Sequence, residues 1–238
     1  EKMLADINTM DTNQFLIRYD FSETADWTLS DKKRYFVNGD TENIKPVTYR
    51  PFEKRFTYYP LDTINEIITR GDSRKGFMRN VQDGNIFLIV TKGNRQLSLG
   101  YFWLCTDLFD LHVLDTAGDS LQSFPLYIFP ADNSQPTLDG RVVRTPNLNS
   151  QIVDKIATAI GETFANEDGD LDGTFAPIDI LDYIYAVLHS PSYREKYKEF
   201  LKIDFPRVPY PKDAATFWQL VTLGGELRQI HLLESPVV

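Results

Sequence analysis

The chain has 238 residues, 42% of them hydrophobic and 13% aromatic, and its formal net charge is −9. This composition excludes a disordered chain and supplies enough apolar side chains for one large or two small domains. The acidic balance argues against simple affinity for nucleic acid, and the single cysteine excludes an intrachain disulfide framework.

The start of the chain, EKMLADINTMDTNQF, has neither the basic nor the apolar region of a signal peptide. It also lacks an initiator methionine, so we expect a piece of a longer chain. No apolar run reaches the length of about 18 residues that a transmembrane helix needs, so no membrane contact is expected. Cys105 lies in an apolar run and is expected to be a buried side chain in a protein of the reducing cytoplasm.

The first 148 residues predict mainly strands. Short apolar or alternating runs rich in β-branched and aromatic residues occupy 13–21, 85–92, 99–106, 111–115 and 125–130. Turn signals such as Asn38-Gly39 and Asp83-Gly84 separate them. One helix is expected over 61–72, ending at Gly71.

From residue 149 onward the sequence predicts helices. Apolar side chains recur with helical spacing over 149–165, 177–190 and 190–202, and again over 213–233. Pro177 suits a first helical turn, Asp213 suits an N-cap, and Gly224-Gly225 predicts a break in the last helix. The expected fold class is therefore α+β, with a β-rich part over 1–148 and a helical part over 149–238 packed against it.

Charge is distributed unevenly along the chain. Residues 32–80 hold 11 Lys/Arg against 6 Asp/Glu, whereas residues 162–182 hold seven acids and no base. Two segments, 49–59 and 190–202, alternate aromatic and basic residues. Such segments can bind phosphate and stack on bases, or they can place aromatics in a core and charges in water. The composition leaves both interpretations open.

The acidic segment 168–179 resembles a calcium loop. Asp168, Asp170 and Asp172 stand at its first, third and fifth positions, and Gly173 stands at the sixth. The twelfth position is Asp179 where a bidentate Glu is required, so we expect a solvated connection and no tight calcium site.

The three histidines lack metal-ligand spacing, with His112 expected on a strand and the other two at helix ends. No nucleotide-binding loop or catalytic set is found, so no catalytic and no metal-binding residue is assigned.

Three blocks together suggest a family: RPFEKRFTYY at 50–59, LDYIYAVLHSPSYREKYKEFLKIDFPRVPYP at 181–211, and LGGELRQIHLLE at 223–234. In this order they resemble the C-terminal specificity segment of single-chain restriction–modification enzymes, type ISP and related type IIG-like. The resemblance covers roughly residues 45–235. The positions that match its motifs are Arg50, Pro51, Phe52, Arg55, Tyr193, Arg194, Tyr197, Pro206 and Arg207, while Glu53 stands where the family usually has Asp.

The resemblance implies a DNA target-recognition region that is not catalytic by itself. It would position double-stranded DNA for an N6-adenine methyltransferase domain upstream in the same chain. The Asn/Asp-Pro-Pro-Tyr/Phe methylation motif is absent here. No cofactor is therefore expected on this chain, while the parent enzyme would use S-adenosylmethionine, with Mg²⁺ and ATP as further candidates.

DNA contacts are expected from the variable section 60–145 and from the two aromatic–basic blocks. The candidate residues are Arg50, Arg55, Arg70, Arg74, Lys75, Arg79, Lys92, Arg95, Arg194 and Lys198. Two other functions remain open: a protein-interaction or scaffold module whose aromatic face docks a partner domain, and a calcium-stabilised binding module.

Overall fold

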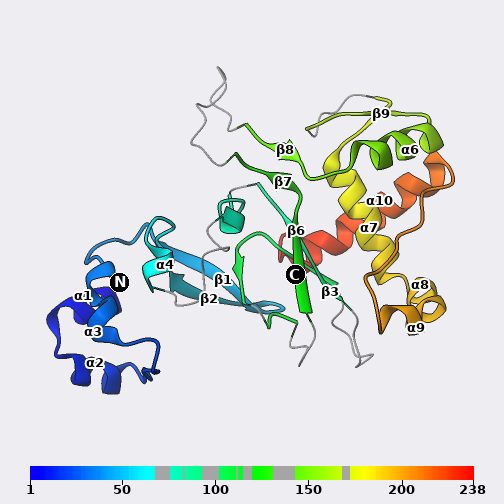
Figure 1. Ribbon diagram of the computed structural model, residues 1–238. Coiled ribbons are helices and arrows are strands. Elements are labelled where there is room, and N and C mark those ends of the chain that lie inside the picture. The colour runs from blue at the N-terminus through cyan, green and yellow to red at the C-terminus, as the bar shows by residue number, and fades with distance from the viewer. Residues whose placement is uncertain are drawn as a thin grey trace. The chain divides into compact units, whose positions relative to one another are not determined.

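The computed structural model describes residues 1–67, 76–82, 84–92, 102–110, 112–114, 120–130, 143–167 and 172–238 (Figure 1). The chain divides into two compact units. The first unit contains Glu1–Val47 and Arg55–Arg79, and the second contains Thr48–Lys54 and Asn80–Val238. Each unit has buried apolar clusters of its own.

The first unit begins with short helices: α1 (Lys2–Thr9), α2 (Thr12–Arg18), α3 (Leu29–Lys32) and the 3₁₀ helix η1 (Lys33–Tyr35). The strand expected over 13–21 is wrong, because these residues form α2. An apolar run as short as Phe15–Ile17 does not distinguish a strand from a helix. Asp11 decides the outcome, since its side chain accepts the amides of Asn13 and Gln14 as an N-cap.

Strands β1 (Ile44–Arg50) and β2 (Glu53–Tyr58) each run from the first unit into the second. They belong to a three-stranded sheet in the order β2-β1-β5, where β5 is Leu108–Phe109. Within the first unit, Tyr58 of β2 is buried with Leu4 of α1 and Ile67 of α4 (Ile64–Ile67). Helix α4 is the described part of the helix expected over 61–72.

The second unit contains an antiparallel sheet in the order β4-β3-β6, formed by β3 (Phe87–Lys92), β4 (Phe102–Cys105) and β6 (Ser120–Pro125). A further pair joins β7 (Tyr127–Ile128) to β8 (Thr145–Pro146). The strands expected within 85–92, 99–106 and 125–130 are thus confirmed. The strand expected over 111–115 is wrong, because residues 112–114 form a turn. His112 is exposed in that turn, where its amide donates to the Asp110 side chain.

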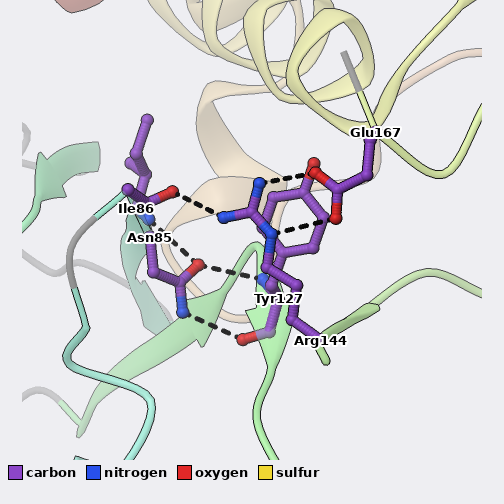
Figure 2. A network of polar contacts seen from close by, with 6 residues as sticks. Asn85, Ile86, Tyr127, Arg144 and Glu167 are labelled. Carbon is purple, nitrogen blue, oxygen red and sulfur yellow. Dashed lines mark hydrogen bonds and ion pairs between the residues drawn. The ribbon is translucent and has the colours of Figure 1, made fainter. Parts of the chain in front are cut away.

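Buried asparagines connect the strands where regular pairing ends (Figure 2). The Asn85 amide group donates to the carbonyls of Asn80 and Tyr127 and accepts the amides of Ile86 and Tyr127. Asn80 accepts the amide of Phe129 in the same way. Because these backbone groups are buried, each needs a partner to avoid a desolvation penalty.

Replacing Asn85 with leucine should therefore lower the free energy of unfolding by about 2–3 kcal/mol, since four backbone groups each lose a hydrogen bond, three of them in buried bonds. Urea denaturation measures the loss. Asn147→Leu is the matched control, because the Asn147 side chain donates to the carbonyl of Pro125 from an exposed residue and should cost about 1 kcal/mol or less. Equal losses for the two variants would contradict this role of Asn85.

The remainder of the second unit is mainly helical. It contains α6 (Ser150–Ile160), α7 (Pro177–His189), α8 (Pro191–Lys196), α9 (Lys198–Leu201) and α10 (Ala214–His231). The parallel strands β9 (Thr163–Phe164) and β10 (Thr174–Phe175) connect α6 to α7. The helices expected over 149–165, 177–190 and 213–233 are confirmed, together with the Asp213 cap, whose carboxylate accepts the amide of Thr216. The helix expected over 190–202 is divided into α8 and α9 at Tyr197.

Helix α10 continues through Gly224-Gly225, so the break expected there is wrong. The glycines instead allow α7 and α10 to approach closely. A Cβ atom on Gly224 would lie 1.9 Å from the carbonyl oxygen of Asp182. Beside this contact Arg228 binds the buried Asp182 carboxylate with two hydrogen bonds, of 2.7 and 2.9 Å. Gly224 therefore sets how near the two helices lie.

One core joins the sheet to the helices. It contains Phe102 and Leu104 of β4 together with Ile156 of α6, Tyr185 of α7 and Phe217 of α10. The α+β class, with helices packed against strands, is confirmed. This core draws residues from both sides of the sequence boundary at 148, and the boundary itself stays a prediction. In the described residues no helix combines the length and apolar character of a membrane span.

Candidate nucleic-acid interface

The tip of the β1–β2 hairpin carries the motif RPFEK in the second unit. Arg50 pairs with the Asp110 carboxylate at 3.2 Å. It also donates to the carbonyl of Tyr49, and its guanidinium lies 4.1 Å from the centroid of the Tyr49 ring. Lys54 pairs with Asp107 at 2.8 Å. Both bases are thus neutralised by acids that follow β4, which favours a structural role for this motif.

Phe52 fixes the same tip against the core. It adopts a left-handed backbone conformation, with φ of 64°, and its ring meets the Trp103 ring edge-on at 4.9 Å. His231, the last residue of α10, stacks on Trp103 at 4.5 Å. The pocket that these side chains line has a volume of about 20 Å³. That is room for about one water molecule, so it does not accommodate a nucleobase.

The other residues of the 50–95 section that were predicted to contact DNA do not belong to the hairpin tip. Arg55 is exposed on β2, in the first unit, and Arg79 is half-buried. Both remain candidates. Arg70, Arg74, Lys75 and Arg95 lie outside the described residues, so their role as DNA contacts stays a prediction.

The tyrosines of the downstream block hold a proline-rich segment, residues 203–212, which we call the strap. Tyr183 and Tyr193 are buried, and their hydroxyls donate at 3.0 Å to the carbonyls of Pro209 and Arg207. The rings of Tyr193 and Tyr197 lie 4.9 Å apart, which confirms that they share one face. The dense aromatic content of this block is therefore explained by the packing of the strap.

Arg194 joins helix ends. Its Nε donates to the carbonyl of Leu188 near the C-terminus of α7. One terminal guanidinium nitrogen, Nη2, lies 3.1 Å from Nδ1 of His189. Burial and the nearby guanidinium lower the pKa of His189 to about 3, so its ring stays neutral and accepts this bond. A cation at a helix C-terminus also complements the helix dipole. These contacts favour a structural role for Arg194.

Segment 190–202, for which phosphate binding was one of two open interpretations, begins with α8. Ser190 accepts the amide of Tyr193 there, as a side-chain cap. The helix has six residues, and this capped end provides no anion site. Lys198 and Lys202 nearby lie 4.0 and 2.6 Å from Glu195 and Glu199, so each lysine has an acid three residues before it.

A different basic surface forms where β3 ends beside the strap. Exposed Lys92, the last residue of β3, has its amine 5.8 Å from the Phe205 ring centroid, and Phe124 of β6 meets the same ring at 6.5 Å. The Arg207 guanidinium lies 5.1 Å from the Phe200 ring. We call this the strap surface and define it as Lys92, Phe124, Ile203, Phe205 and Arg207. Of these residues, only Lys92 was assigned to DNA from the sequence.

Arg207 was recognised in the sequence as part of the downstream motif, but it was not assigned to DNA. Its side chain is 80% exposed, and its guanidinium lies 3.9 Å from the Asp204 carboxylate. The signal in the sequence was its setting between Pro206 and Pro209, since proline stiffens an extended segment and removes backbone donors. That Phe205, two residues earlier in the strap, lies beside Lys92 of β3 depends on tertiary packing.

The acidic section 162–182 lies at the other end of α7. Glu162 accepts from Trp218, Glu167 pairs with Arg144, and Asp179 accepts the amide of Ala176 (Figure 2 shows the Arg144–Glu167 pair). Figure 1 shows β9 and α6 at one end of α7 and α8 and α9 at the other. With its 13 residues, α7 spans about 20 Å. Asp179 and Asp182 of this section lie in the first half of α7 itself.

The calcium-like loop receives no support. Asp168 and Asp170 lie outside the described residues, and Asp179 at its twelfth position already caps α7. No group of acidic, histidine or cysteine side chains suited to a metal occurs in the described ranges.

Cys105 is buried, as expected, and burial raises the pKa of its thiol. His189 and His231 end α7 and α10, also as expected.

Comparison with known proteins identifies relatives. A family model described as "Type ISP C-terminal specificity domain" matches residues 2–238. No curated protein matches. Similar solved structures include the cryo-EM structure of a DrdV–DNA complex, which is 24% identical with a TM-score of 0.55. Another is the ATP-dependent Type ISP restriction–modification enzyme LlaBIII bound to DNA, 20% identical with a TM-score of 0.56.

At these identities the two structures show the similarity of fold. Each alignment covers 97% of this chain but only 20% of the DrdV chain and 13% of the LlaBIII chain. The chain thus spans a small part of the length of the proteins that it matches.

Proposed function

Because this chain belongs to the family of Type ISP C-terminal specificity domains, we propose that it is the DNA-recognition region of a restriction–modification enzyme. It positions double-stranded DNA and catalyses no reaction by itself. The observation that carries the proposal is the family match, which extends over residues 2–238. The two similar structures add support, since both are complexes with DNA.

The chemistry of the second unit is compatible with this role. The strap surface combines exposed cations with aromatic rings, a combination that suits the sugar–phosphate backbone. The pocket at the hairpin tip is too small for a base, so it is not a place where an extruded nucleotide would bind. A methyltransferase domain in the same polypeptide would bind S-adenosylmethionine, while Mg²⁺ and ATP would serve nuclease and translocase domains in the cytoplasm.

A domain exchange tests the proposal. In the full-length enzyme, residues 2–238 are replaced by the specificity domain of a relative that methylates a different sequence. Sequencing of methylated adenines in plasmid DNA should then show the relative's site, because the recognition region determines which bases are contacted. Reinserting the original domain through the same junctions is the control. A folded, active chimera that still methylates the original site would refute the proposal.

One observation favours docking onto another protein domain as a second function. Leu223 and Ile230 are exposed on α10, with Leu223 58% exposed. They continue the line of the partly buried Leu220 and Leu227. Such an apolar face is suited to contact with a neighbouring domain. Changing both exposed residues to glutamine should then weaken attachment of this region to the rest of the enzyme, as measured by limited proteolysis.

A further inference from the structure

We propose that the strap surface binds the phosphate backbone of DNA without reading its sequence, with Lys92 and Arg207 as the contacting cations. This inference rests on the proposed function and identifies the surface that performs part of it. The two residues are 115 positions apart in the sequence, but the Lys92 amine lies 5.8 Å from the ring of Phe205, which precedes Arg207 by two residues in the strap. The surface lies within the second unit.

The strap is held in place by its backbone. Its carbonyls at Arg207 and Pro209 accept bonds from buried tyrosines of α8 and α7, and its side chains Phe205 and Val208 pack against the core. Three prolines, at positions 206, 209 and 211, restrict its backbone further. A surface that is ordered before binding loses less conformational freedom when DNA binds.

The side chains provide what a phosphate backbone requires. Arg207 is highly exposed and can donate to a phosphate through two parallel N–H groups. Lys92 supplies a second cation at the adjoining strand end. Ile203 is 74% exposed and Phe124 is 45% exposed, so apolar contact with the sugars is available between and beside the charges.

A rigid surface of this kind suits features that every duplex shares. Phosphates fix the register of a protein on DNA, whereas base edges carry the sequence. Contacts from the strap surface should therefore contribute equally to binding of unrelated sequences. Tyr193 acts as a positioning residue, because its hydroxyl holds the carbonyl of Arg207.

The test uses the full-length enzyme and two fluorescent duplexes of about 30 base pairs with unrelated sequences. Affinity is measured by anisotropy as a function of salt. Each phosphate contact contributes about 0.9 to the slope of log affinity against log salt. For Lys92→Gln/Arg207→Gln we expect a slope that is less steep by about 2 and an affinity on the order of 50-fold lower at 0.1 M salt. The loss should be the same for both duplexes.

The control variants also remove positive charges, but at positions outside the strap surface. Lys45→Gln on β1 and Lys2→Gln on α1 remove exposed lysines outside the strap, and their slopes should equal that of the wild type. Tyr193→Phe keeps the ring but removes the bond to Arg207. It should give a slope between those of the wild type and the double variant, with a melting temperature close to the wild-type value.

The outcomes separate the inference from the proposed function. An unchanged slope in the double variant, with normal binding by the wild type, would overturn the inference and leave the proposed function standing. A loss confined to one duplex would also overturn it, because it would indicate reading of bases. If the wild-type enzyme itself showed no salt-dependent binding of either duplex, the proposed function would fail as well.

Discussion

Gly224→Ala should lower the free energy of unfolding by at least about 3 kcal/mol, at the upper end of what overpacking costs. The added Cβ would lie 1.9 Å from the carbonyl oxygen of Asp182 and 2.6 Å from its carbonyl carbon. Both atoms belong to the backbone of α7, so no side-chain rotation relieves the overlap. The two helices must separate, which opens the core around Tyr185 and Phe217. Chemical denaturation followed by tryptophan fluorescence measures the loss.

Gly225→Ala provides a matched control in the same helix. There the nearest atom to a new Cβ is the Asp182 side-chain oxygen Oδ2, at 3.1 Å. A side-chain end can shift, and alanine is favoured over glycine in a helix by about 1 kcal/mol. We expect a net change within about 1 kcal/mol. Similar stabilities for the two variants would show that α7 and α10 do not approach as closely as described.

Arg228→Met should cost about 3–5 kcal/mol at neutral pH, because it leaves a buried carboxylate without its partner. Asp182 is 4% exposed, and in the wild type its carboxylate receives both bonds from Arg228. Lys202→Gln is the control. It removes a pair that is as short, 2.6 Å, but whose acid Glu199 is 80% exposed, and such a pair contributes about 1 kcal/mol or less.

The Arg228 prediction carries a pH dependence. Burial already raises the pKa of Asp182, while the bonds and charge of Arg228 act to lower it. Without Arg228 only the raising effect remains, and the folded variant binds a proton more readily than the unfolded chain does. The stability that a raised pKa contributes is present at low pH and is lost as pH rises through the folded pKa. The variant's deficit should therefore shrink as pH falls from neutrality toward acid.

A second variant tests whether the buried charge is the cause. Asp182→Asn/Arg228→Gln leaves two neutral groups that can still form a hydrogen bond across the helices. It should recover at least half of the loss seen for Arg228→Met, because no charge is then buried alone. If the double variant is as unstable as the single one, packing of the arginine stem would be the larger contribution.

Local sequence signals determined a large part of this protein. Helices α6, α7 and α10 were predictable, since each has apolar residues at helical spacing and a start signal: Asn149, Pro177 or Asp213. Strands β3 and β4 followed from their apolar runs. The family resemblance, carried by the order of three motifs, is confirmed by the family match. Periodicity and capping act over a few residues, so they can be read without knowledge of the fold.

The tertiary structure decided which polar and basic residues meet. Arg50 has Asp110 as its partner, 60 positions away, and Arg194 is occupied by the end of α7. The continuity of α10 through its glycines follows from contact with Asp182 in α7, not from helix propensity. Lys92 meets Phe205, two residues before Arg207, only because the strap folds back onto the end of β3. Charge and aromaticity can be counted along a sequence, but whether a cation is paired or exposed depends on packing between distant segments.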